Sequence, residues 1–259
     1  MIYMKLRKIM SPFFVGALVV AILGFSLWIT NQHALLSIVM STITLLAAFG
    51  VAILGLAQFG DDGLVREDPF HMMNILLTFG LFAFTAGEAA ALIISQISVG
   101  TSFYFSTGIL QIVGVALWLM GVLGYLIAVN EVMQFLEKRK LGLLILVVSL
   151  VAMIIPLVAS LILSGIVPRL NLLTHIPLAV GLTMIAVSLG LVFMSYRRGI
   201  LAIPIGLALF GCLLFLIRVV FWILFSFPHL YALNLILASE SYILLGASII
   251  AARQVRFSV

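Results

Sequence analysis

The sequence predicts an all-α polytopic membrane protein, a bundle of eight transmembrane helices with both termini in the cytoplasm. Hydrophobic residues make up 65% of the 259 residues and charged residues only 8%, whereas a soluble domain has about a quarter charged residues. The mean hydropathy is +1.38. Long apolar runs alternate with short polar breaks, which is the pattern of multi-pass membrane proteins. The basic residues gather at one set of these breaks.

Each apolar run is long enough for one helix that crosses the hydrocarbon core, which takes about 20 residues. Only helices and closed barrels satisfy their backbone hydrogen bonds in lipid, and the sequence has no strand-like alternation, so the runs are predicted to be helices. The predicted spans cover approximately residues 11–30, 35–59, 72–98, 107–129, 141–165, 176–196, 200–226 and 232–252. We expect residues 1–259 to form a single integral membrane domain, because no loop is long enough for a soluble one.

The first span follows the basic residues Lys5, Arg7 and Lys8, which is also how a signal peptide begins. Its apolar run, residues 12–29, is longer than a typical signal-peptide core. No small-residue cleavage site closes the run cleanly. We therefore interpret it as a membrane span.

The later spans are separated by breaks rich in polar residues, glycine and proline. These breaks are residues 31–33, 61–69, 101–106, 131–140, 168–174, 197–199 and 226–229.

The distribution of Lys and Arg predicts the orientation. With a cytoplasmic N-terminus nearly all of the 13 basic residues fall on the cytoplasmic side, Arg169 falls on the other side, and Arg218 lies within a span. The positive-inside rule then places both termini in the cytoplasm and the protein in the cell membrane. The net charge of +5 is explained by this topology. A basic face for nucleic acid is not predicted.

Three ionisable side chains, Glu88, Arg218 and Glu240, lie inside predicted spans. A charge near the bilayer centre costs roughly 2.5 to 3.5 kcal/mol even on the lenient insertion scale, so each is expected to face the bundle interior. The topology places them roughly 5, 8 and 3 Å to the outer side of the middle of their spans, at a rise of 1.5 Å per residue. We expect one layer in which Arg218 joins the two carboxylates.

Polar neighbours on the same spans extend this predicted site. Thr85 shares a polar stripe with Glu88, and Gln111 lies slightly further out on the next span. On the last span Asn234 and Ser241 share a polar face, and Glu240 lies on the adjoining face. The predicted solute- or proton-binding residues are Glu88, Arg218, Glu240, Gln111, Thr85, Ser241 and Asn234.

The favoured hypothesis is a membrane protein that binds or transports a small polar solute or ion through this layer. One guanidinium neutralises only one carboxylate fully, so one glutamate is expected to keep a proton and to offer proton coupling. The alternatives are a non-catalytic membrane subunit or sensor module that acts through a partner protein, and a quinone- or haem-linked redox subunit. In a subunit or sensor module of this kind the charges would only hold helices together. The sequence shows no nucleophile motif or phosphate loop, so it favours neither an enzyme nor a cofactor, and the oligomeric state stays open.

Two weaker candidates remain. His33, His175 and His229 fall at the outer ends of spans, but they come from separate loops without metal-type spacing. Interfacial hydrogen bonding is therefore favoured over a zinc or copper site. The single cysteine, Cys212, excludes an internal disulfide.

The basic cluster Lys138, Arg139 and Lys140 predicts a contact with anionic lipid or with a protein partner.

Overall fold

The computed structural model describes residues 2–60, 68–97, 102–134, 136–162, 169–224 and 228–256. These residues form eight helices and contain no strand, which confirms the all-helical prediction. The helices are α1 (Ile2–Ile29), α2 (His33–Phe59), α3 (Pro69–Ile97), α4 (Ser102–Met133), α5 (Lys138–Ile162), α6 (Arg169–Tyr196), α7 (Ala202–Leu224) and α8 (Pro228–Arg256). Each matches one predicted span. Seven of them, all but α5, contain a described stretch that is long and apolar enough to cross a membrane.

Local hydrogen bonds and turn residues fix several helix ends. The backbone N–H of Phe70 donates to Asp68 Oδ1 at 2.9 Å, so Asp68 caps the start of α3. Asn31, in the turn between α1 and α2, has a positive φ of 55°, a conformation in which asparagine is enriched. After α4, the amide of Asn130 donates to the carbonyl of Leu136 at 2.8 Å and accepts from its N–H at 3.1 Å. These bonds hold the turn that leads to α5.

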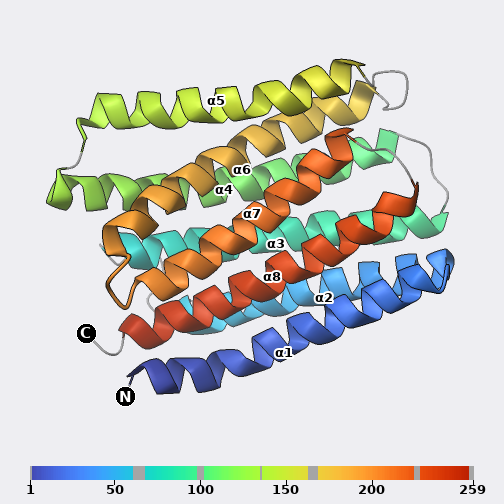
Figure 1. Cartoon of the computed structure of the whole chain (residues 1–259), viewed down its shortest axis with the longest axis horizontal. Coiled ribbons are helices and arrows are strands. Elements are labelled where there is room, and N and C mark those ends of the chain that lie inside the picture. The colour runs from blue at the N-terminus through green and yellow to red at the C-terminus, as the bar shows by residue number, and fades with distance from the viewer. Residues whose placement is uncertain are drawn as a thin grey trace.

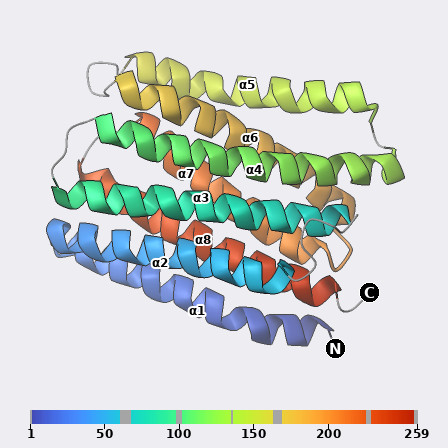
Figure 2. The same cartoon turned by 180° about the vertical axis from the view of Figure 1, so that it is seen from behind.

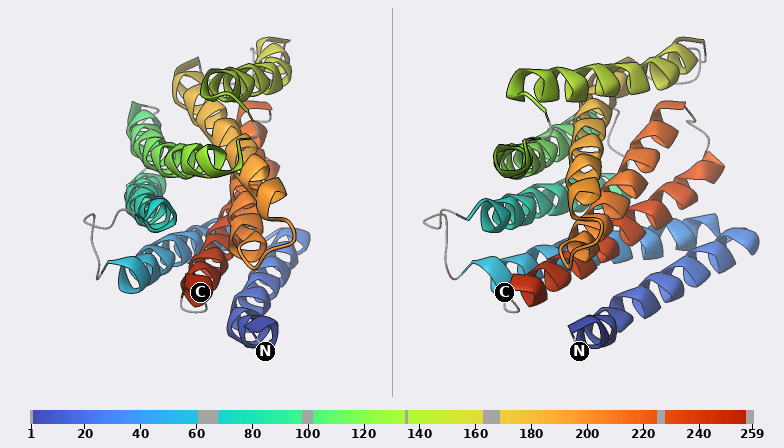
Figure 3. Two further views of the ribbon diagram at one scale, coloured as in Figure 1. Left: turned by 90° about the vertical axis from the view of Figure 1, so that its left-hand side faces the viewer. Right: turned by 60° about the vertical axis from the view of Figure 1, so that its left-hand side comes forward.

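The helices lie side by side along one direction, with α1 and α5 at opposite edges of the bundle (Figures 1 and 2). Helix α8 is central and packs against α7, α2 and α1, while α5 packs mainly on α6. In an apolar 18-residue stretch of α8 72% of the residues are buried, against 6% in that of α1. The two termini lie at the same end of the bundle (Figures 1 and 3). Which side of a membrane that end faces stays a prediction.

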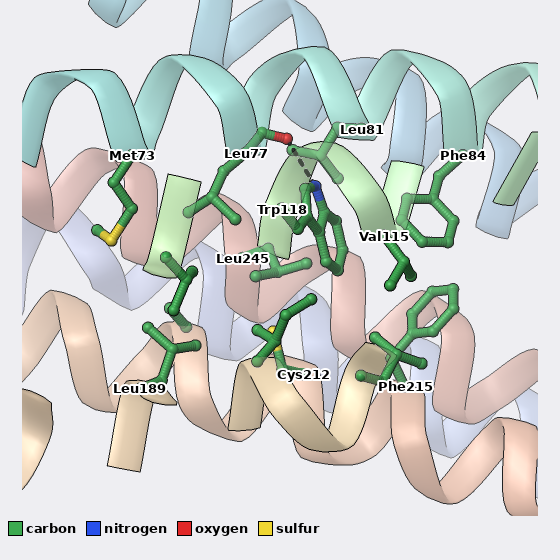
Figure 4. Close-up of a cluster of buried hydrophobic side chains, with 14 of the residues drawn as sticks. Met73, Leu77, Leu81, Phe84, Val115, Trp118, Leu189, Cys212, Phe215 and Leu245 are labelled. Carbon is green, nitrogen blue, oxygen red and sulfur yellow. Dashed lines mark hydrogen bonds between the residues drawn. The ribbon is translucent and has the colours of Figure 1, made fainter. Parts of the chain in front are cut away.

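The centre of the bundle is a buried aromatic cluster formed by Phe84 of α3, Trp118 of α4, Phe215 of α7 and Tyr242 of α8. The ring centroids of Phe84 lie 4.6 Å from those of Trp118 and 4.8 Å from those of Phe215, and Phe215 lies 5.5 Å from Tyr242. The indole N–H of Trp118 donates to the carbonyl of Leu77 at 2.8 Å (Figure 4). This bond satisfies the one polar group of a fully buried side chain.

Close approach of α3 and α4 makes this cluster possible. A Cβ atom on Gly80 of α3 would overlap the indole ring of Trp118, and one on Gly114 of α4 would lie 2.8 Å from the ring of Phe84. The two glycines therefore make the space that the aromatic rings fill. Small residues at helix contacts are the usual means of close packing in membranes.

Candidate functional site

Glu88 of α3 and Arg218 of α7 form a two-point ion pair inside the bundle. Arg218 Nη1 lies 2.5 Å from Glu88 Oε1, and Nη2 lies 3.2 Å from Oε2. Both residues are buried, with exposed fractions of 5% for Glu88 and 8% for Arg218. The fork of the guanidinium matches the two carboxylate oxygens, which is the strongest arrangement for such a pair. The structure thus joins two of the three charges that the sequence places in spans.

Helix α8 completes the hydrogen bonding of the pair. Tyr242 donates its hydroxyl to Glu88 Oε1 at 3.0 Å, and Arg218 Nε donates to Asn234 Oδ1 at 3.0 Å. The guanidinium also lies over the ring of Phe215, 5.1 Å from its centroid, at a distance where a cation is attracted to an aromatic face. Buried ions need such partners to offset the loss of water. The cluster therefore connects α3, α7 and α8.

The ion pair borders a cavity of about 80 Å³. One water molecule needs about 10–15 Å³ of such space, so the cavity has room for several waters or a small solute. Its polar lining consists of Ser41, Glu88, Thr107, Gln111, His175, Arg218 and Asn234, and its apolar lining includes Ala91, Phe215 and Trp222. Open space and polar side chains therefore surround part of the ion pair, together with apolar side chains.

The cavity lies in the half of the bundle away from the termini. Its lining comes from the first parts of α2, α4, α6 and α8 and from the last parts of α3 and α7. Phe215 lines the cavity and also belongs to the aromatic cluster, whose other members lie further toward the termini along their helices. The aromatic cluster thus adjoins the cavity on the side of the termini.

Glu240 is not part of this cluster. It is half-buried, it does not line the cavity, and its buried Oε1 has no hydrogen-bond partner among the described residues. Glu240 and Tyr242 are two positions apart, about 200° around the helix, so they face nearly opposite sides of α8. The expected contact of Arg218 with two carboxylates is therefore replaced by a contact with one.

The other predicted site residues divide between the cavity and the packing. Gln111 and Asn234 line the cavity. Thr85 donates to the carbonyl of Leu81 in its own helix at 2.8 Å, and Ser241 donates to the carbonyl of Gly211 of α7 at 2.7 Å. The hydroxyls of Thr85 and Ser241 thus serve helix structure and helix packing in this structure.

Sequence reasoning missed several polar residues of the cluster. Tyr242 is the main omission, and its signal was available: it follows Asn234 by eight residues, about 80° around the helix, so both face the same side. Ser41 and Thr107 gave no such signal, because a lone hydroxyl in a span usually bonds to its own helix. Only the packing of α2 and α4 brings these two to the cavity.

The histidines do not assemble into a metal site within the described part of the chain, where no group of three or more His, Cys, Asp or Glu side chains has metal-binding geometry. His33 is exposed at the start of α2. His175 lines the cavity, its ring 5.9 Å from that of Trp222 and its Nδ1 3.3 Å from Thr174 Oγ1. The side chain of His229 lies outside the described residues.

The predicted basic surface lies at the start of α5. Lys140 Nζ pairs with Glu137 at 3.1 Å, and both side chains are exposed. Together with Arg139 they border an open groove of about 660 Å³ whose apolar wall includes Leu143. The side chain of Lys138 lies outside the described residues. The contact with anionic lipid or a protein partner stays a prediction.

No family model, curated protein or solved structure matches this chain. The fold and the site by themselves define a multi-pass helical membrane protein with a buried Glu–Arg pair at a polar cavity. The specific function therefore has to be inferred from the geometry of that cavity.

Proposed function

We propose that this protein binds a small polar solute or ion in the cavity beside Glu88 and Arg218 and moves it across the membrane. The observation that supports this proposal is that the buried ion pair borders a cavity of about 80 Å³. Ionisable residues inside membrane spans that face such spaces commonly mark the path of a substrate or an ion. A pair that served only to hold helices together would need no cavity beside it.

The lining chemistry favours a solute that is charged at two points or strongly dipolar. A carboxylate of the solute would compete with Glu88 for Arg218, and an ammonium group or a metal cation would compete with Arg218 for Glu88. Gln111 and Asn234 add neutral amide groups that both donate and accept hydrogen bonds. Since the ion pair is neutral as a whole, a solute without net charge keeps the site neutral.

Movement across the membrane requires the opposite half of the bundle to open. Phe84, Trp118 and Phe215 pack against one another in the aromatic cluster beside the cavity (Figure 4), so we expect this cluster to open for passage toward the termini. Transporters commonly alternate access by moving one group of helices against another around a fixed site. In this protein α7 and α8 are suited to that role, since they carry Arg218, Asn234 and Tyr242 and pack closely on each other.

A matched pair of substitutions on α3 tests the cavity. Ala91 lines it, whereas Ala86 is exposed on the outer surface of the bundle. We expect Ala91→Leu to fill the space and Ala86→Leu to leave it open. Purified wild-type protein and both variants are to be heated with free amino acids, small organic cations and monovalent inorganic cations. A solute that binds only the folded state at 100 times its Kd stabilises that state by about 2.7 kcal/mol.

The expected result is that one class of solute raises the melting temperature of the wild type and of Ala86→Leu but not of Ala91→Leu. That solute should then enter liposomes containing the wild type or Ala86→Leu, with Ala91→Leu inactive. Equal binding and flux in two folded variants would show that the cavity is not the site. If no solute stabilises the wild type and a stoichiometric partner co-purifies with it, the subunit or sensor hypothesis replaces this proposal.

A further inference from the structure

Glu240 lies on the stripe of α8 that faces α1. Ile236, Glu240 and Ala251 fall within about 60° of one another around the helix. Ile236 packs on Gly24 of α1 so closely that a Cβ atom on this glycine would lie 2.6 Å from Ile236 Cγ1. Further along, Ala251 packs with Met10 of α1. These two contacts lie on either side of Glu240 along α8, and the Met10–Ala251 cluster also packs against Ile203 and Leu207 of α7, so Glu240 faces the side of α8 that α1 and α7 border.

The helices α1 and α2 offer no ionisable partner at this level. Residues 12–30 of α1 and 34–59 of α2 contain no Asp, Glu, Lys, Arg or His. The basic residue Lys8 belongs to the beginning of α1, near the level of Met10 rather than that of Gly24. Glu240 is thus surrounded on this side by apolar and small residues.

The described side chains of α7 and α8 add no partner either. Arg218, the charged residue of α7, points its guanidinium to Glu88 and Asn234. On α8, Tyr242 points to Glu88, and Arg253 lies 13 positions away, about 20 Å along the axis. Cys212 of α7 belongs to the apolar core. The buried Oε1 of Glu240 accordingly has no hydrogen-bond partner in the part of the chain that the structure describes.

We propose that Glu240 is a proton-binding site at the interface of α1 and α8, separate from the cavity. An anionic carboxylate without a cation or a hydrogen-bond donor is strongly disfavoured in apolar surroundings, whereas the carboxylic acid is neutral. The site is half-buried, and it adjoins the helix with the fewest buried residues in its spanning segment. The exchange of this proton requires a displacement of α1 that opens a water path to the acid along the interface.

The site also has a route to the cavity. Helix α8 carries Glu240 on one face and Asn234 and Tyr242 on another, so a shift of α8 on loss of the proton would act on the Glu88–Arg218 pair. This role as a coupling site rests on the proposed function. The binding of the proton itself does not.

Reaction with dicyclohexylcarbodiimide, an apolar reagent for protonated carboxyl groups, tests the proton site. The full-length protein in liposomes of zwitterionic phospholipid is treated at a series of pH values, and modified peptides are identified by mass spectrometry. We expect Glu240 to be modified, with modification falling several-fold as the pH is raised and the acid loses its proton. Glu240→Gln should remove the modification. Glu137, which is exposed to water, reports non-specific reaction.

A second readout covers the case in which the reagent does not reach the residue. The infrared carbonyl band of a protonated carboxyl group should be present in the wild type, missing in Glu240→Gln, and lost from the wild type at high pH. The proposal is overturned if the wild type and Glu240→Gln have the same infrared carbonyl band. It is equally overturned if Glu88 is modified in place of Glu240, or if modification of Glu240 is independent of pH.

Each of the two proposals can be refuted without refuting the other. Neither the carbodiimide nor the infrared measurement uses a solute, so a negative result at Glu240 leaves the cavity proposal standing. Conversely, a pH-dependent modification of Glu240 stands even if Ala91→Leu leaves solute binding unchanged. If both hold, Glu240→Gln should keep the thermal stabilisation by solute and lose the dependence of flux on a pH gradient.

Discussion

Two faces of helix α8 differ in whether the charged groups beside them have hydrogen-bond partners. On one face Asn234 and Tyr242 bond to the Arg218–Glu88 pair, so that Glu88 receives hydrogen bonds from two side chains. On the other face Glu240 has a buried oxygen with no hydrogen-bond partner among the described residues. Both glutamates lie in spans at a similar predicted depth. The direction in which a glutamate points around its helix axis, rather than its depth in the membrane, therefore decides whether its carboxyl group is paired.

The helices opposite each face explain the difference. Arg218 of α7 and Glu88 of α3 meet the first face and bring complementary charges. The second face meets α1, which offers glycine and apolar side chains such as Gly24. A polar side chain that points toward a neighbouring helix in a membrane finds hydrogen-bond or charged partners only if that helix carries them at the contact. Glutamine substitutions distinguish the two environments directly.

The largest effect is expected for Glu88→Gln. It leaves the buried guanidinium of Arg218 without a counter-charge, and breaking one side of a buried pair costs about 3–5 kcal/mol. Thermal unfolding in detergent should show a marked fall in melting temperature, and Glu88→Gln combined with Arg218→Gln should recover part of it. The matched control is Glu137→Gln, which breaks an exposed pair worth at most about 1 kcal/mol. Equal melting temperatures for Glu88→Gln and Glu137→Gln would contradict the buried pair.

A smaller effect is expected for Tyr242→Phe. The substitution keeps the ring in the aromatic cluster and removes the hydroxyl that donates to Glu88, a loss of about 0.5–1.5 kcal/mol. The melting temperature should fall, and the further fall should be smaller when Tyr242→Phe is added to Glu88→Gln, because a neutral amide oxygen is a weaker acceptor than a carboxylate. Additive effects of the two substitutions would show that Tyr242 stabilises the bundle independently of Glu88.

The smallest effect is expected for Glu240→Gln. If Glu240 is a neutral acid, the neutral amide of nearly the same shape should change the free energy of unfolding by no more than about 0.5 kcal/mol. The same measurement on Glu88→Gln supplies the comparison. A loss of stability at Glu240 as large as that at Glu88 would mean that Glu240 has an ionic partner, and it would remove the contrast between the two faces.

Much of the architecture was predictable from local features of the sequence. The length of each apolar run predicted one helix, and the polar breaks predicted where the helices end, because lipid leaves the backbone no other way to satisfy its hydrogen bonds. The choice of Glu88 and Arg218 as central residues followed from the energetic cost of a charge in a span. The partners of these charges did not follow, and Tyr242 was overlooked because tyrosine in a span has no such cost.

The sequence by itself determined that the chain is a helical membrane protein and that Glu88, Arg218 and Glu240 lie within its spans. Those properties depend on composition and on the order of residues along one helix. Only the tertiary structure decided that Arg218 pairs with Glu88, that a cavity lies beside this pair, and that Glu240 does not line this cavity. The physical reason is that a helix presents residues on all sides, and the side that meets a partner is set by the packing of small and large side chains between helices.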